Sequence, residues 1–165
     1  MKNVTLIFNN EISPDTFAEL NTLLQDNYSD DTKITLFFSS VGGQIAYIPA
    51  FIYLINTYVD TLIGISNIES AGMDIFLYSK PRKKKVYDNT IGAIHLRSHT
   101  VERMFNEKIP NEQGYHEIIK KQMKPDYDMY KKLGVNKKDI KKMKEGGIVF
   151  IDTKTLKKEV KKYYG

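Results

Sequence analysis

The chain has 165 residues, of which 41% are hydrophobic, and a formal net charge of +5. That length suits one well-cored domain and is short for two. The absence of cysteine excludes disulfides, thiolate zinc sites and a cysteine nucleophile, so nucleophilic chemistry must use an oxygen or a lysine. No run of 18 apolar residues and no signal h-region is present, so we expect a cytoplasmic protein that does not enter a membrane.

The positive charge is concentrated in residues 82–85 and 131–162. A basic face can bind nucleic acid or an acidic partner. Lysines interspersed with acidic and apolar residues are, however, typical of the solvated face of a helix. No aromatic residues interleave with these basic runs in the manner of a single-strand binding motif, so nucleic acid is an unlikely partner.

The first half of the chain alternates strands and helices. Strands are predicted at residues 4–8, 34–38 and 61–66, where apolar residues cluster. Ser13 and Pro14 mark a helix start, as N-cap and first-turn proline. A second helix should follow Gly43, with Pro49 kinking or delaying it. A third is predicted over 71–78.

Short extended pieces follow at 85–87 and 92–94, so the pattern predicts an α/β domain with a mainly parallel sheet. Residues 101–144 are charged and helical in period, which indicates a helical arm. A last short strand is predicted at 148–151, and Asp152 should cap a final lysine-rich helix.

Three chemical groups follow predicted strands: the Gly42-Gly43 pair, Ser70 and His95. Loops at the carboxyl ends of parallel strands can present chemistry together. A glycine turn offers N–H donors, a serine a nucleophile and a histidine its base, which are the parts of a serine hydrolase. Each also has an ordinary interpretation: a plain turn, a helix N-cap and a buried histidine.

The combination resembles the proteolytic subunit of the Clp protease, ClpP, over nearly the whole chain. The likeness rests on the run Ser39-Ser40-Val41-Gly42-Gly43, on Ser70-Ala71-Gly72 and on Ile94-His95, with Ser70 and His95 spaced as in that family. Val41 stands where proline is usual. The resemblance implies an α/β, crotonase-like fold of repeated β-β-α units in one domain, 1–165. Its head would comprise 1–95 and 145–165, and a protruding helical handle would comprise 96–144.

The resemblance also implies the site. Ser70 would be the nucleophile, His95 the general base, and the N–H groups of Gly43 and Ala71 the oxyanion hole. A peptide or unfolded-protein substrate would lie along the edge of Gly42 and Gln44. No cofactor or metal would be needed. The subunits would form a homo-oligomeric ring, stacked on a second ring through residues 111–133.

Three departures from the family bear on activity. The usual aspartate before the last strand is absent, and the candidates for the third triad member are Glu145, Asp74 and Asp152. Asp74 falls one helical turn after Ser70, where the family has an apolar residue. The segment that forms the axial gate does not precede the first strand, which argues against coupling to an AAA+ unfoldase.

Three alternatives to an active peptidase follow. The first is a catalytically impaired ClpP-like scaffold or regulatory subunit, which the missing aspartate favours. The second is an acyl-CoA enzyme of the wider crotonase fold, which would not need the Ser–His pair. The third is a basic nucleic-acid-binding module.

Overall fold

The computed structural model describes residues 1–95 and 130–164. The chain divides into two compact units, the first made of Met1–Ile94 and Ile148–Gly165 and the second of His95–Gly147. The expected division into a head and a handle stays a prediction. Residues 96–129, which make up most of the predicted handle and include residues 111–129 of the predicted ring contact, lie outside the described residues.

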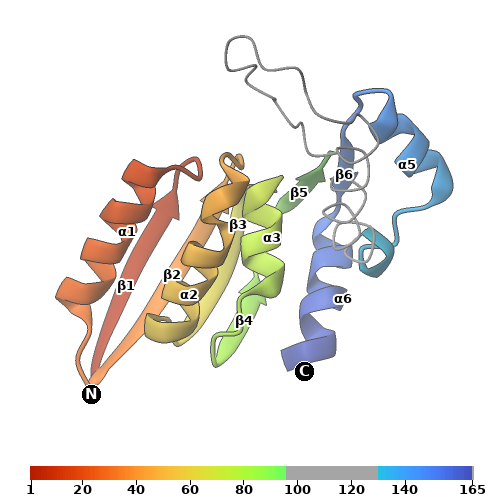
Figure 1. Ribbon diagram of the computed structural model, residues 1–165. Coiled ribbons are helices and arrows are strands. Elements are labelled where there is room, and N and C mark those ends of the chain that lie inside the picture. Colours follow the sequence, from red (N-terminus) through yellow and green to blue (C-terminus); the bar gives the residue numbers. More distant parts are fainter. Residues whose placement is uncertain (96–129, 165) are drawn as a thin grey trace, which may run out of the picture. The chain divides into compact units, whose positions relative to one another are not determined.

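The first unit is built on a six-stranded sheet (Figure 1). Its strands follow the order β1-β2-β3-β5-β6, with β4 also pairing with β3. Every pairing is parallel except that of β5 with β6. The mainly parallel α/β sheet is therefore confirmed. The strands are β1 (Lys2–Asn9), β2 (Thr32–Ser40), β3 (Thr61–Glu69), β4 (Lys83–Val86), β5 (Ile91–Ile94) and β6 (Val149–Ile151).

Strand β3 has a different neighbour at each end. Its first residues pair with β4, and its last residues pair with β5. The register of β2 against β3 shifts between Phe38 and Ser40 of β2. Ser66 in this irregular stretch has a φ of 51°, and the Ser39 hydroxyl donates to the Asn67 carbonyl at 2.9 Å. The bulge redirects the end of β3 toward β5.

Helices α1 (Pro14–Asn27), α2 (Ile48–Tyr58) and α3 (Ala71–Tyr78) lie side by side over one face of this sheet (Figure 1). The predicted start of α1 is confirmed, because the Ser13 hydroxyl accepts from the Thr16 N–H at 3.2 Å and Pro14 is in the first turn. Pro49 delays α2: a 3₁₀ turn (Ile45–Tyr47) comes first, and Pro49 then occupies the first helical turn.

The core lies between the sheet and these helices. Phe8 and Phe38 on neighbouring strands stack at 5.4 Å, and Phe51 of α2 meets Phe8 edge-on at 5.4 Å. Aromatic pairs of this kind add to the apolar burial that holds the layers together. The carboxyl ends of β2 and β3, which precede the Gly42-Gly43 turn and Ser70, are therefore fixed on a rigid support.

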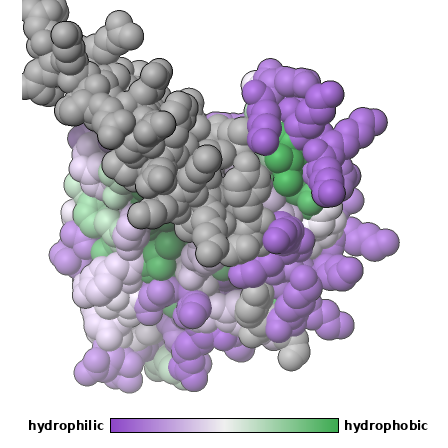
Figure 2. Space-filling view, turned by 45° about the vertical axis from the view of Figure 1, so that its right-hand side comes forward, coloured by the Kyte–Doolittle hydropathy of each residue, from purple (hydrophilic) through white to green (hydrophobic). Residues whose placement is uncertain are grey.

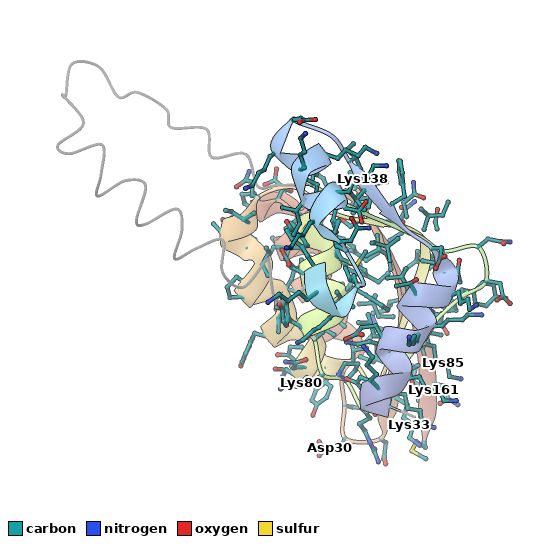
Figure 3. The ribbon with its side chains drawn as sticks, turned by 90° about the vertical axis from the view of Figure 1, so that its right-hand side faces the viewer. Asp30, Lys33, Lys80, Lys85, Lys138 and Lys161 are labelled. Carbon is teal, nitrogen blue, oxygen red and sulfur yellow. The ribbon has the colours of Figure 1, made fainter. Side chains whose placement is uncertain are left out.

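The last helix, α6 (Thr153–Tyr164), begins at its predicted cap, since the Asp152 carboxylate accepts from the Thr155 N–H at 2.7 Å. Its lysines are exposed, and hydrophilic side chains dominate the surface over it (Figure 2). Figure 3 shows Lys161 of this helix, and Lys33 and Lys85 of the sheet, extending away from the ribbon. The described helices include none that is long and apolar enough to span a membrane.

In the second unit, α5 (Lys137–Lys144) is the helix that follows the turn after Tyr130. Asn136 caps it: its side-chain oxygen accepts from the N–H groups of Lys138 and Asp139. The described part of the predicted charged arm is thus helical, with a break at Gly134, where φ is +74°.

Candidate active site

Ser70 occupies a sharp turn between β3 and α3. Its backbone has φ 49° and ψ −123°, and its side chain makes no capping hydrogen bond to the helix. A serine at positive φ is strained, and such strain persists where the surrounding structure imposes it, as it does at many active sites. A nucleophilic serine on a strained strand-to-helix turn is the arrangement that exposes Oγ in many hydrolases. The side chain of Ser70 therefore does not cap α3, as the side chain of an ordinary N-cap serine would.

Gly42 lies directly against Ser70. A Cβ atom added to Gly42 would stand 2.6 Å from the Ser70 Cβ and 3.2 Å from its Oγ. Gly42 also has a φ of +94°, which a side chain rarely allows. The sequence therefore needs glycine here for two reasons, and the turn after β2 is brought onto the hydroxyl of Ser70.

Gly43 is held by a short bridge to Ile12. The Ile12 N–H donates to the Gly42 carbonyl at 2.7 Å, and the Gln44 N–H donates to the Ile12 carbonyl at 2.8 Å. In a parallel bridge of this kind, the N–H and C=O of the central residue, Gly43, point away from Ile12. The Gly42 C=O and the Gln44 N–H are thus bonded internally, and the outward pair belongs to Gly43. The expected substrate edge along Gly42 and Gln44 stays a prediction.

Ala71 is the first residue of α3, and it is only 1% exposed. Its N–H is one of those that a helix start leaves without an intrahelical acceptor. Among the described residues, neither the N–H of Ala71 nor the N–H of Gly43 has a hydrogen-bond acceptor. Two N–H donors without acceptors, next to a half-buried serine, are what an oxyanion site requires.

The strand that leads into His95 ends beside Ser70. The Ser70 N–H donates to the Ala93 carbonyl at 2.9 Å, and the following residue of β5, Ile94, is buried. His95 is the next residue in the chain and the first of the second unit. There its carbonyl accepts from the Tyr130 hydroxyl at 3.1 Å. The pairing of His95 with Ser70 stays a prediction.

The three candidate carboxylates have different environments. Glu145 ends α5, is 67% exposed and pairs with Lys141 at 4.0 Å. Asp152 is engaged as the cap of α6, and the N–H of Thr155 holds the pKa of Asp152 below its usual value. Asp74 is 4% exposed and lies in the first turn of α3, the helix that follows Ser70. Only Asp74 is both buried and on the same helix as the proposed oxyanion donor Ala71.

Some features of the site could not be found from the sequence. Nothing in the sequence marks Ile12 as the residue that orients the glycine turn. The backbone strain at Ser70 also cannot be predicted from its residue type.

The described residues contain no cluster of three or more side chains able to hold a metal ion.

The six-stranded sheet and its helices form an α/β fold that is similar to that of ClpP. A solved structure of a mutant of ClpP1 from Listeria monocytogenes is similar, with a TM-score of 0.63 and 20% sequence identity over 94% of this chain and 86% of that chain. No family model and no curated protein matches the sequence. The similarity supports the fold and not the activity.

Proposed function

We propose that this chain is a ClpP-like serine endopeptidase subunit. The observation that carries the proposal is the backbone of Ser70, strained at φ 49° between β3 and α3, with Gly42 against its hydroxyl. The outward N–H of Gly43 and the N–H of Ala71 supply the oxyanion donors. The ClpP-type fold supports the same interpretation.

In this mechanism the Ser70 Oγ attacks the carbonyl carbon of a peptide bond while His95 removes its proton. The negative oxygen of the tetrahedral intermediate accepts hydrogen bonds from Gly43 and Ala71. His95 then protonates the leaving amine, which leaves an acyl-enzyme on Ser70. A water molecule, deprotonated by His95, hydrolyses that ester. The residues of this chain need no metal or nucleotide for these steps.

The proposed substrate is an extended peptide or an unfolded protein, paired with the outward groups of Gly43. We propose further that head and handle form one ClpP-like domain, that subunits assemble into a ring, and that rings stack through residues 111–133. The similarity to a ClpP structure supports ring assembly as the working hypothesis.

A catalytically impaired ClpP-like scaffold is the second candidate. The observation that favours it is the state of two of the carboxylates: Glu145 is exposed and paired with Lys141, and Asp152 caps α6. Without an orienting carboxylate, the imidazole of His95 is not held in the productive tautomer, which costs about 10⁴-fold in kcat in a serine protease.

Labelling with a fluorophosphonate probe tests the proposal. We expect the probe to phosphonylate Ser70 in the intact chain, as located by peptide mass spectrometry, and Ser70→Ala to abolish labelling. Ser66→Ala is the matched control. Ser66, like Ser70, is a serine with a positive φ, but it lies within β3, is exposed and is outside the site. Absence of probe on Ser70 in the assembled protein would leave the scaffold candidate standing.

The third triad member can be assigned by three separate substitutions. We expect Asp74→Asn to slow labelling of Ser70, because Asp74 is the buried carboxylate on the nucleophile's helix. Glu145→Gln and Asp152→Asn should leave the labelling rate unchanged, since both carboxylates are exposed and Asp152 caps α6. Rates measured across pH 5–9 decide the assignment, and a larger loss in either of the latter two variants would contradict it.

A further inference from the structure

Two adjacent serines at the end of β2 are buried without being part of the proposed chemistry. Ser39 is 3% exposed and Ser40 is 1% exposed. A buried hydroxyl is costly unless it forms hydrogen bonds. The partners of these two hydroxyls therefore indicate why polar residues stand in this part of the core.

Ser40 faces the glycine turn. Its Oγ accepts from the Gly42 N–H at 3.1 Å, a bond that is itself buried. This bond fixes the start of the turn that places Gly42 against Ser70 and directs the N–H of Gly43 outward.

Ser40 also packs against the helix that follows the nucleophile. A Cβ atom added to Gly72 would stand 2.8 Å from the Ser40 Cβ and 3.2 Å from both its Oγ and its carbonyl oxygen. Gly72 is the second residue of α3 and follows Ala71. One small side chain is therefore wedged between the turn that carries one oxyanion donor and the helix that carries the other.

We propose that Ser40 is the positioning residue of the oxyanion site: it sets the spacing between the N–H of Gly43 and the N–H of Ala71. The inference rests on the proposed function. Oxyanion donors must be held close to the ideal distance, because a misplacement of about 1 Å costs on the order of 10²-fold in rate. Ser40 acts through Gly42 and Gly72 and does not itself touch the substrate.

Ser39 provides a matched control. It is the neighbouring residue, it is equally buried, and its hydroxyl also makes one hydrogen bond, at 2.9 Å to the Asn67 carbonyl in the β3 bulge. Ser39→Ala and Ser40→Ala therefore remove the same atom and one bond each. A purely structural role would make the two substitutions equivalent in stability and in activity.

The test compares both variants with the intact full-length chain. We expect Ser40→Ala to lower the maximal rate of Ser70 phosphonylation by about 10- to 100-fold while the probe concentration for half-maximal rate is unchanged. Ser39→Ala should stay within about threefold of the unsubstituted chain, with a similar fall in melting temperature in both variants. Equal labelling rates in the two variants would overturn the proposal.

A second measurement does not depend on activity. In ¹⁵N–¹H spectra of the full chain, Ser40→Ala should accelerate hydrogen exchange at the Gly42 amide and shift the amide resonances of Gly43 and Ala71. Ser39→Ala should leave those three amides unchanged. If the unsubstituted chain does not label at Ser70, the proposed function fails, and the amides still decide the role of Ser40: equal spectra in both variants reject it.

Discussion

Gly42→Ala is expected to abolish labelling of Ser70, with a loss of at least about 100-fold in rate. The new Cβ would stand 2.6 Å from the Ser70 Cβ and 3.2 Å from its Oγ, so either the turn or the nucleophile must move. The φ of +94° adds backbone strain of about 1–2 kcal/mol. The rate of fluorophosphonate labelling and the free energy of unfolding in urea measure the two effects.

The control for Gly42→Ala is Gly134→Ala. Gly134 also has a positive φ, +74°, but nothing lies within 4 Å of a Cβ added there. That variant should lose stability through backbone strain alone and keep the labelling rate of the unsubstituted chain. If Gly42→Ala labels as fast as Gly134→Ala, the contact between the glycine turn and Ser70 does not govern reactivity.

Local patterns were sufficient to predict most of the first unit. Runs of apolar residues predicted the positions of β2 and β3. Burial nevertheless alternates along β2 and along the first half of β3, because α1, α2 and α3 cover one face of the sheet. Ser13 and Asp152 were predicted as helix caps from residue type alone, and hydrogen bonds confirm both. Pro49 was predicted to kink or delay α2, and it sits in the first turn, where a missing N–H costs nothing.

The features that could not be predicted from the sequence depend on contacts between segments that are distant along the chain. The bridge between Ile12 and Gly43 joins residues 31 positions apart, and no local pattern of the sequence encodes it. The bonds that the Gly42 carbonyl and the Gln44 N–H make to Ile12 are likewise tertiary, and neither residue type indicates them. The roles of Ser39 and Ser40 likewise follow from what each hydroxyl reaches, since the two residues are chemically identical.

Lys84 is a buried cation whose position was not predicted. It lies on β4, is 6% exposed, and its Nζ donates to the carbonyls of Leu77 at 3.1 Å and Ser79 at 2.5 Å, at the end of α3. The rings of Phe76 and Tyr164 lie 5.4 and 5.3 Å from the same Nζ. No carboxylate pairs with it among the residues that the structure describes.

Burial of the Lys84 side chain disfavours its charged form. Burial, with a smaller contribution from the charge of Lys80, lowers the pKa of Lys84 from 10.5 to about 8. Between those two values the unfolded chain binds a proton that the folded chain has lost, so stability rises with pH across this window. A shift of that size corresponds to about 3 kcal/mol, gained as pH rises from about 8 to about 10.5.

The change should be visible in urea unfolding measured between pH 7.5 and 10. We expect the free energy of unfolding of the unsubstituted chain to rise with pH over this range. The rise should be smaller in Lys84→Met, by up to about 2–3 kcal/mol. Lys85→Met is the matched control, because the neighbouring Lys85 lies on the same strand but is exposed, and it should keep the full slope. Burial raises the pKa of Tyr164 above 10, and this lowers stability only at higher pH. Parallel curves for the unsubstituted chain and Lys84→Met would show that Lys84 stays charged in the folded protein, with its two carbonyl bonds offsetting the cost of burial.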